Sequence, residues 1–436
     1  MTLKPKRILI VLIGLAIGMS FYFLGLLLPQ VRAGMHQQHR DGGHFCGNDL
    51  YPIWLTTGEL LARRTTSPYS PAMEHSIESG LYGRPLDRSL SADAAINYRG
   101  FSYPLYTDVL AVPLSLTSFR NVQIVLLALF PLLILLSVRW WCIGIGLTLS
   151  PVLFAIAALL TLFTVQVLEG WWALQPTMLV GALLAFALAA LRRNALAFAG
   201  IALALGSIKP QLILLPALWL ALWTFADWTR RRRALLALAL SMLVLLALSE
   251  LWVPMWWLSW WHQLPAYRHF DTPPLVELIF GKLIGRVLGL ATLCLATIAA
   301  LRWRRLPADG SHFSLLFAFL VATGVVFISS SIAVYDQFLL VPGLLIVWRD
   351  RSSAGSSRTL RFAMLIMAVA FCWPWVAAPT VYLAHVISPS MVSPQVTILP
   401  LITAASFPLL LLTVLSMLVL KQLPEIASPD DSQVSA

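Results

Sequence analysis

Long apolar runs alternate with short polar linkers along this chain of 436 residues, and arginines gather in every second linker. The other linkers carry Asp, Gln, Tyr and Trp with an occasional single Lys. A helix of about 20 apolar residues spans the hydrocarbon core of a bilayer, and basic residues concentrate in cytoplasmic loops. The pattern therefore predicts a polytopic membrane protein with one basic face and an outer face that carries the polar chemistry.

The composition excludes a water-soluble fold, because 59% of the residues are hydrophobic and 11% are charged, whereas soluble domains carry about 25% charged residues. Inside a bilayer, only helices and closed barrels satisfy the backbone polar groups. The apolar runs are continuous rather than alternating, which indicates helices and an all-α fold. The net charge of +11 resides in short linkers, so it indicates membrane orientation and argues against nucleic-acid binding.

Basic clusters set the predicted topology of about twelve transmembrane helices with both termini in the cytoplasm. Residues 103–119 are apolar but contain Asp108 and Pro113. A span there would place Arg192 and Arg193 outside, so we interpret this stretch as an interfacial or re-entrant helix. The predicted spans are 8–28, 121–138, 142–164, 174–191, 195–208, 211–228, 234–252, 280–301, 313–330, 334–348, 361–378 and 397–420.

Two outer loops interrupt the predicted integral-membrane domain of residues 1–423. The first loop, residues 29–102, is rich in Tyr, Pro, Gly and Ser, and the second, residues 253–279, is rich in Trp. Because Trp and Tyr favour the headgroup level of a bilayer, we expect both loops to lie along the membrane surface. Residues 424–436 are predicted to form a disordered cytoplasmic tail.

The first outer loop carries the main candidate for catalysis, Asp49, which precedes Tyr51 and Trp54. A carboxylate near a membrane–water boundary is able to act as a general base. The alternative is a solvated loop acid without a chemical role. The loop ends with Arg99 and Tyr103, which suit phosphate binding and stacking on a sugar or isoprenoid. Their alternative is a place in an interfacial aromatic belt.

A lysine separates two apolar runs on the outer side, in the segment Ser207-Ile208-Lys209-Pro210-Gln211. A charged group at membrane depth is costly and usually functional. Pro210 suits the first position of the next helix, which would bring Lys209 close to free backbone N–H groups and create an anion site. The alternative is a lysine whose ammonium group reaches back to the interface.

Two further outer turns carry polar side chains. Gln166 and Glu169 lie on one of them, and Tyr335 and Asp336 lie on the other. Asp336 suits a hydrogen bond to a hydroxylated ligand or to Lys209. The competing interpretation of Asp336 is a structural cap at a helix start.

Neither a metal nor another cofactor is predicted. His36, His39 and His44 with Asp41 fit no standard ligand spacing. The four cysteines form no C-x-x-C pair, so neither a zinc site nor a disulfide framework is indicated.

The motifs, taken in order, resemble those of a known family. They are similar to bacterial membrane glycosyltransferases of family 87, the polyprenyl-phosphate-mannose-dependent mannosyltransferases of the GT-C superfamily. The chain departs from that family with Tyr103-Pro104-Leu105 in place of Tyr-Pro-Pro and Val165-Gln166 in place of Gly-Gln. The similar segments are Asp49 with its aromatics, Gly58-Glu59-Leu60-Leu61, Pro68-Tyr69, Phe101-Ser102-Tyr103-Pro104, Gln166, Lys209-Pro210-Gln211 and Tyr335-Asp336.

The resemblance implies a GT-C-like fold, a reaction and a set of roles. Asp49 would be the catalytic base, and Lys209 with Arg99 would bind the donor phosphate. The reaction would move a hexosyl unit, which the resemblance implies to be mannose, from a polyprenyl phosphate to a glycan or glycolipid at the outer face of the bacterial inner membrane, with inversion and without a metal. The residues expected to contact the substrates are Tyr51, Tyr103, Gln166, Gln211, Tyr335 and Asp336.

Two other functions compete with this one. A lipid or solute transporter, such as a flippase, would use the break at Lys209-Pro210. Transporters usually carry repeated halves with polar groups near the bilayer midplane, and no repeat is evident in this sequence. A lipid-linked ligase would use the same fold with a lipid-diphosphate donor.

Overall fold

The computed structural model of the protein describes residues 5–37, 46–87, 89, 93, 100–270, 272–331, 333–354 and 357–424. Across these ranges the chain forms helices, and no β-strand beyond one isolated bridge between Pro274 and Ser330. The predicted all-α class is therefore confirmed. The predicted tail lies outside the described residues apart from Pro424.

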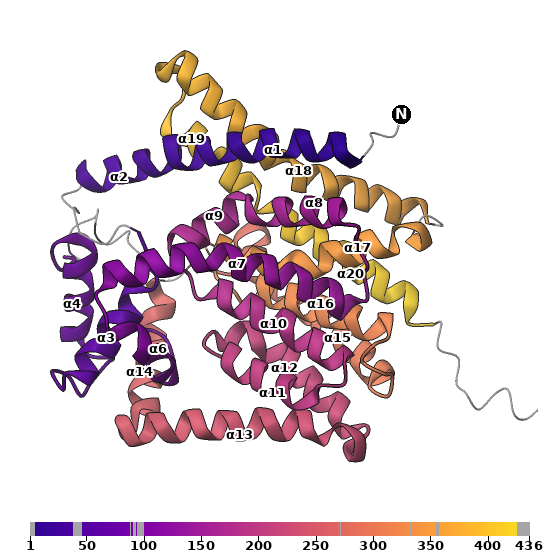
Figure 1. The fold of residues 1–436 in the computed structure, drawn as a ribbon, viewed down its shortest axis with the longest axis horizontal. Helices are drawn as coiled ribbons and strands as arrows, with labels where there is room; N and C mark the ends of the chain where they lie inside the picture. The colour runs from indigo at the N-terminus through magenta and orange to yellow at the C-terminus, as the bar shows by residue number, and fades with distance from the viewer. Residues whose placement is uncertain are drawn as a thin grey trace, which may run out of the picture.

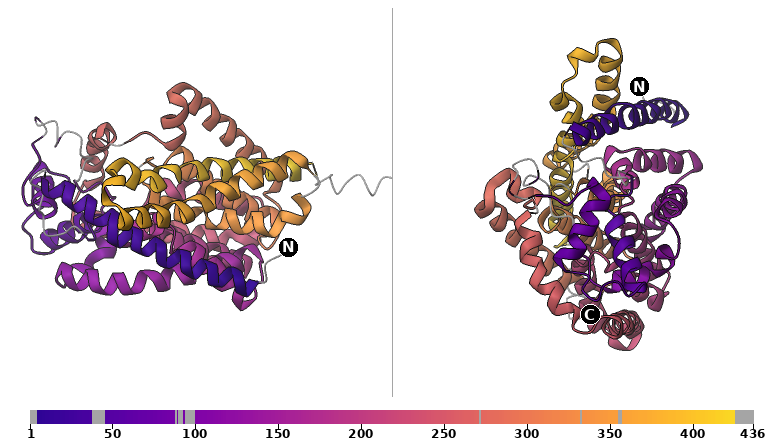
Figure 2. Two further views of the ribbon diagram at one scale, coloured as in Figure 1. Left: turned by 90° about the horizontal axis from the view of Figure 1, so that it is seen from above. Right: turned by 90° about the vertical axis from the view of Figure 1, so that its left-hand side faces the viewer.

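The outer loops of the prediction lie together at one end of the molecule. Helices α3 (Tyr51–Leu61), α4 (Pro71–Tyr82), α6 (Tyr106–Ser115) and α14 (Trp256–Phe270) gather there, on the left in Figure 1. The indole N–H of Trp260 joins the two loops by donating to the Ser102 carbonyl at 2.9 Å. The first described residues lie at the opposite end, as Figure 1 and the left view of Figure 2 show.

Long helices run between these two ends. The first is a continuous helix over Pro5–Gln37, which contains α1 (Pro5–Tyr22), the π-helical turn η1 (Phe23–Leu27) and α2 (Leu28–Gln37). The remaining helical elements, long and short, are α7 (Phe119–Ile145), α8 (Pro151–Leu162), α9 (Val165–Trp172), α10 (Thr177–Arg192), α11 (Leu196–Gly206), α12 (Pro210–Phe225), α13 (Trp228–Trp252), α15 (Leu275–Trp303), α16 (Ser311–Phe327), the 3-10 helix η2 (Val334–Leu340), α17 (Val341–Ala354), α18 (Arg358–Ile387), η3 (Pro389–Met391), α19 (Pro394–Thr403) and α20 (Ser406–Gln422).

The described residues contain six helices that are long and apolar enough to cross a membrane. The number is seven if α8 and α9, whose axes are bent by 63° relative to each other, form one broken span. Four shorter apolar helices, α10, α11, α12 and α16, lie among them. The protein is therefore a polytopic helical membrane protein. The predicted number of twelve spans also counts these shorter helices and the segment of η2 and α17, and that count stays a prediction.

Two of the short helices, α10 and α16, lie in the core. Most of their residues are buried, as expected for helices that are apolar on all sides. Helix α12 starts with Pro210, and α10 starts directly after Pro176. Proline suits a helix start because its missing N–H would have no partner there. These prolines lie at the N-terminal ends of the two helices, beside polar residues.

The stretch predicted to be interfacial or re-entrant, residues 103–119, contains the ten-residue helix α6. At about 1.5 Å per residue this helix is too short to cross the bilayer, which agrees with the prediction. Its Asp108 is fully buried against α3, where it pairs with the Thr57 hydroxyl at 2.7 Å. The pair fixes α6 on α3, the helix that directly follows Asp49.

One arginine of the predicted cytoplasmic quartet has a structural role as well. Arg231 is buried at the start of α13 and stacks over the Trp223 ring at 4.1 Å. Its guanidinium group donates to four backbone carbonyls at the ends of α12 and α15, those of Trp223, Arg304, Arg305 and Leu306. These carbonyls have no partner within their own helices, so Arg231 caps two helix ends at once.

Candidate active site

A tight turn places Asp49 on the end of α9. Gly47 has a φ of +75° and its N–H donates to the Trp172 carbonyl at 2.9 Å, while the Asp49 N–H donates to the Ala173 carbonyl at 3.3 Å. A Cβ at position 47 would approach the Leu174 side chain to 2.9 Å, and the positive φ already favours glycine. The turn thereby satisfies the last carbonyls of α9 and fixes the backbone of Asp49.

A buried glutamine orients the Asp49 carboxylate. The Gln175 amide donates to Asp49 Oδ2 at 2.6 Å, and Gln175 is 2% exposed. The Tyr103 hydroxyl lies 3.5 Å from Gln175 Oε1, so the start and the end of the first outer loop meet at this amide. Asp49 itself is only partly buried. The hydrogen bond from Gln175 therefore holds the carboxylate in one orientation.

A buried ion pair lies at the start of α12, the helix that follows Lys209. Lys209 Nζ lies 3.1 Å from Asp336 Oδ1 and 2.6 Å from Thr177 Oγ1. Both charged side chains are less than a tenth exposed. The Thr177 hydroxyl donates to Asp336 Oδ1 at 2.5 Å, and the Ser329 hydroxyl donates to Asp336 Oδ2. A buried pair is tolerated when further hydrogen bonds satisfy its polar atoms, as they do here.

The aromatic ring of Tyr335 covers this ion pair, with its centre 4.8 Å from Lys209 Nζ. Such a contact stabilises an ammonium group through the electrons of the ring face. Tyr335 also lies against α9, because a Cβ on Gly170 would approach the Tyr335 Cβ to 2.9 Å. The prediction that Asp336 bonds to Lys209 is thus confirmed by the pair, and Pro210 starts α12 as predicted.

The segment Gln175-Pro176-Thr177 connects Asp49 with Lys209. Gln175 binds the Asp49 carboxylate, and Thr177 binds both members of the ion pair. Two residues along a chain span at most about 7 Å. The candidate base and the candidate phosphate ligand therefore approach one segment at the start of α10, although they are 160 residues apart in sequence.

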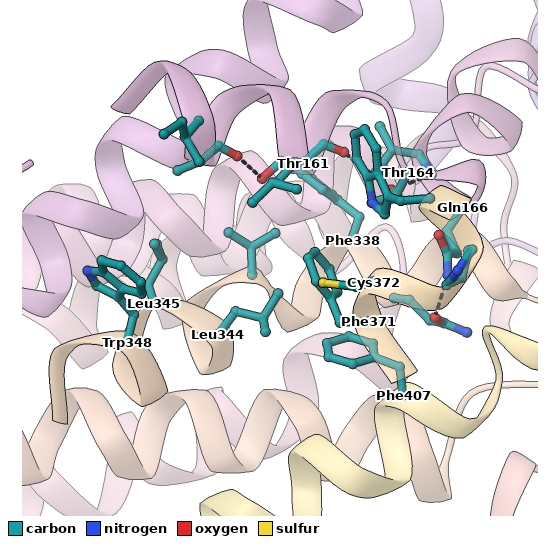
Figure 3. A pocket seen from close by; sticks show the side chains of 18 of the residues that line it. Thr161, Thr164, Gln166, Phe338, Leu344, Leu345, Trp348, Phe371, Cys372 and Phe407 are labelled. Carbon is teal, nitrogen blue, oxygen red and sulfur yellow. Dashed lines mark hydrogen bonds between the residues drawn. The ribbon is translucent and has the colours of Figure 1, made fainter. Parts of the chain in front are cut away.

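An apolar cavity of about 360 Å³ adjoins this cluster and is drawn in Figure 3. Side chains of α8, α17, α18 and α20 line it, including Leu344, Phe371 and Phe407. Gln166 lies at one end of it in Figure 3, where its amide donates to Gln337 Oε1 at 3.0 Å. Since Gln337 directly follows Asp336 in η2, the polar end of the cavity adjoins the ion pair.

The remaining predicted site residues lie elsewhere or outside the described residues. Tyr51 is buried and packs on the rings of Trp54 and Phe119. Gln211 is the second residue of α12. The predicted roles of both stay predictions. Arg99 is outside the described ranges, as are His39, His44 and Asp41 of the rejected metal site.

Within the described part of the chain, no group of three or more His, Cys, Asp or Glu residues could hold a metal ion. The expectation that the protein needs neither a metal nor another cofactor stays a prediction. The site as described offers one oriented carboxylate, one neutralised ion pair and several amide and hydroxyl groups.

Sequence reasoning missed three residues that hold this site together, namely Gln175, Thr177 and Ser329, and it named Glu169 without a role. A signal was present for the first two. Gln175 and Thr177 flank a proline between two apolar runs, just as Ser207 and Gln211 flank the Lys209-Pro210 break. Polar residues beside a proline at the start of an apolar helix thus mark both sides of the site.

Comparison with known families decides the identity. The sequence model of glycosyltransferase family 87 matches residues 101–331, which is more than half of the chain. The chain belongs to glycosyltransferase family 87. This family 87 protein is therefore a membrane glycosyltransferase, and the resemblance inferred from its motifs is confirmed. No curated protein and no solved structure matches the chain.

The matched region contains one part of the site of this family 87 glycosyltransferase. Tyr103, Gln175 and Lys209 lie within residues 101–331, whereas Asp49 and Asp336 lie outside that range. Both acids contact the matched region, because Asp49 bonds to Gln175 and Asp336 pairs with Lys209.

Proposed function

We propose that this glycosyltransferase moves a hexosyl unit, mannose by family resemblance, from a polyprenyl phosphate to a glycan or glycolipid acceptor. The acceptor would lie at the outer face of the bacterial inner membrane. The observation that supports the proposal most is the pairing of Asp49 and Lys209 with the same segment at the start of α10. A base and a phosphate ligand must lie on opposite sides of one reactant pair, and this segment holds both.

In this proposal Asp49 is the catalytic base. Its carboxylate accepts the proton of the acceptor hydroxyl, whose oxygen then attacks the anomeric carbon from the face opposite the phosphate and inverts it. The bond between the anomeric carbon and the phosphate oxygen breaks, and the polyprenyl phosphate leaves with the electron pair. A phosphate leaves without a general acid, so one carboxylate suffices where glycoside hydrolases use two. The hydrogen bond from Gln175 keeps the accepting oxygen in position.

Lys209 would stabilise the phosphate as its charge develops. The ammonium group has three N–H donors, and Thr177 and Asp336 accept two of them. The third is available to a phosphate oxygen next to the Tyr335 ring. Asp336 already balances the charge of Lys209. The ammonium group would therefore act on the phosphate as an oriented N–H donor rather than as a net positive charge. Donors of this kind are typically worth about 3–4 kcal/mol in the transition state.

The apolar cavity supports a lipid-linked donor. Its lining is almost entirely hydrocarbon, with the bonded amides of Gln166 and Gln337 at one end. A polyprenyl chain placed there would direct its phosphate towards Lys209. A nucleotide donor would bring a diphosphate and a polar ribose, for which the cavity offers few partners.

The test is to supply the purified protein, reconstituted in lipid, with labelled polyprenyl-phosphate hexoses, a polyprenyl-diphosphate hexose and a nucleotide hexose, each with native envelope glycolipids. We expect consumption of a polyprenyl-phosphate hexose and release of polyprenyl phosphate. Consumption of the diphosphate alone would favour the ligase, and consumption of the nucleotide sugar alone would contradict the proposal.

A transporter is the second candidate, and one observation favours it. Lys209 and Pro210 separate two core helices, and transporters often place their sites at such breaks. Movement of a lipid-linked sugar across proteoliposome membranes without any glycosidic bond transfer would support this function. Bond transfer in the same vesicles would exclude transport as the main activity.

A further inference from the structure

The apolar cavity of about 360 Å³ has one polar end, which two amide side chains form. Gln166 and Gln337 both line the cavity, and the amide of Gln166 donates to Gln337 Oε1 at 3.0 Å. The two threonines of the lining use their hydroxyl protons on backbone carbonyls of α8. Thr161 donates to the Ala157 carbonyl, and Thr164 donates to the Thr161 carbonyl. A ligand in the cavity therefore finds its hydrogen-bond donors at the amide pair.

The indole groups of the lining lie away from this polar end or below its surface. Trp348 lies at the opposite end of the cavity from Gln166, with Leu344 and Phe371 between them, as Figure 3 shows. The indole nitrogen of Trp375 is buried, so it does not open onto the cavity. The cavity thus has the polarity of an amphiphile, with hydrogen-bonding groups at one end and hydrocarbon along the rest.

The hydrogen bond from Gln166 sets the orientation of the Gln337 amide. A primary amide carries its oxygen and its two N–H donors on different sides of one carbon. Since the oxygen of Gln337 faces Gln166, its N–H donors point away from Gln166. The Gln337 side chain is only partly buried, so a ligand is able to reach these donors.

The short helix η2 connects Gln337 with Lys209. The Tyr335 ring lies 4.8 Å from Lys209 Nζ, and Asp336 Oδ1 lies 3.1 Å from the same atom. Gln337 is the next residue of η2, and adjacent Cα atoms are about 3.8 Å apart. Three successive residues therefore contact either the ammonium group or the cavity.

Helix α9 holds these residues from the other side. Gln166 and Gly170 are four residues apart on α9 and share one of its faces. Gln166 binds Gln337, and a Cβ on Gly170 would approach the Tyr335 Cβ to 2.9 Å. The polar end of the cavity and the residues around Lys209 are thus packed on a single helix face.

We propose that Gln337 is a phosphate-binding residue that makes the enzyme recognise the prenyl chain and the phosphate of its donor together. This inference rests on the proposed function. With the prenyl chain in the cavity, one phosphate oxygen accepts from the Gln337 amide and another lies next to Lys209. Hydrogen bonds to a charged oxygen are stronger than those between neutral groups. A lipid without a phosphate fills the same apolar space and leaves the amide donors of Gln337 unused.

The first experiment measures donor KM and kcat for Gln337→Glu. Glutamate keeps the size of the side chain and the oxygen that accepts from Gln166, but it replaces the N–H donors by an oxygen that repels phosphate. We expect the KM to rise by about 10- to 100-fold. The kcat should stay within about threefold of the wild type, because the bond is present in the bound donor and in the transition state alike.

Two further variants complete the kinetic test. Gln337→Met removes the donors without adding a charge and should raise the KM by about tenfold, which keeps the test open if Gln337→Glu does not fold. The matched control is Gln37→Glu, the same chemical change at an exposed residue at the end of α2. Its KM and kcat should equal those of the wild type.

The second experiment detects binding without transfer, through alkylation of native cysteines by N-ethylmaleimide in mixed micelles. Cys372 is exposed and lines the cavity, whereas Cys294 is exposed on α15 and does not line it. Polyprenyl phosphate should slow the alkylation of Cys372 and leave that of Cys294 unchanged. Polyprenol, which lacks the phosphate, should need a concentration about tenfold higher. In Gln337→Met the two lipids should protect Cys372 at similar concentrations.

Three results would overturn the inference. One is an unchanged donor KM in a folded variant of Gln337, including one in which kcat alone falls. Another is alkylation of Cys372 that polyprenyl phosphate does not slow. The third is equal protection of Cys372 by phosphatidylglycerol, which would make the cavity a general site for bilayer lipids. Absence of transfer by a wild-type protein whose Cys372 is still protected would refute the proposed function instead.

Discussion

Breaking the buried pair of Lys209 and Asp336 is expected to destabilise the protein strongly, and removing both charges is not. Lys209→Met leaves the Asp336 carboxylate less than a tenth exposed without its cation. Removal of one partner from a buried pair typically costs about 3–5 kcal/mol. Asp336→Asn removes the anion and leaves the ammonium group with Thr177 and the Tyr335 ring, so we expect a cost of similar size, about 3 kcal/mol.

The double variant, Lys209→Met with Asp336→Asn, replaces two buried charges by neutral groups of similar volume. Such replacements are often close to neutral. The asparagine still accepts from Ser329 and is able to donate to Thr177, which preserves much of the network around position 336. The double variant should therefore be more stable than either single one, which gives a coupling energy of about 3 kcal/mol or more between the two sites.

The assay is unfolding of the purified variants in mixed micelles by increasing amounts of denaturing detergent, followed by near-ultraviolet circular dichroism. Lys282→Met serves as the control, because Lys282 is an exposed lysine on α15 and should change stability little. Transfer activity is measured on the same samples. If Lys209 serves the donor phosphate, the double variant should be stable and still inactive. If the losses in unfolding free energy of the two single variants simply add in the double variant, the coupling between Lys209 and Asp336 is refuted.

Three further predictions concern groups around the site. Gln175→Ala frees the Asp49 carboxylate from its buried donor, so kcat should fall by about 10–100-fold in the donor assay while the secondary structure by circular dichroism is unchanged; unaltered kcat would remove the orienting role. Burial raises the pKa of Asp108 well above its usual value, so its stabilising contribution is greatest below about pH 4 and declines above it by up to about 1.4 kcal/mol per pH unit. Asp108→Asn should therefore gain stability relative to the wild type as the pH rises from about 4 to about 7, and a constant difference in unfolding free energy would contradict this. Arg231→Lys cannot reach the four carbonyls that the guanidinium group binds, so it should cost about 2–4 kcal/mol in detergent unfolding, whereas the exposed neighbour change Arg232→Lys should cost almost nothing.

The sequence predicts the class of this fold and part of its site for identifiable physical reasons. Apolar runs of bilayer length and arginine clusters predict helices and their ends, because the bilayer leaves few alternatives. The Lys209-Pro210 break predicts both a helix start and a functional cation, and both members of the Lys209 and Asp336 pair were candidates. The preference of proline for the first position of a helix depends only on its own backbone, so a helix start can be inferred from it without a structure.

Other features depend on how distant segments pack, and sequence periodicity does not show that. Helix α10 is apolar on nearly all sides, so no stripe indicates which face meets Asp49. The contact of Gln175 with Asp49 spans 126 positions of sequence. The 63° bend between α8 and α9 and the 3-10 geometry of η2 leave no mark in the pattern of apolar residues. They explain why a count of apolar runs differs from a count of long helices.

Asp49→Asn tests the central claim most directly, which is that Asp49 is the base for sugar transfer from a lipid phosphate. The variant keeps the size of the side chain and the contact to Gln175, and it removes the ability to accept a proton. Loss of a general base typically lowers the rate by about 100–10,000-fold. We predict a loss of this size in single-turnover transfer from a labelled polyprenyl-phosphate hexose. The control is Asp309→Asn, a change at an exposed acid between α15 and α16, and it should stay close to the wild type. Transfer by Asp49→Asn within a few-fold of the wild type would contradict the account.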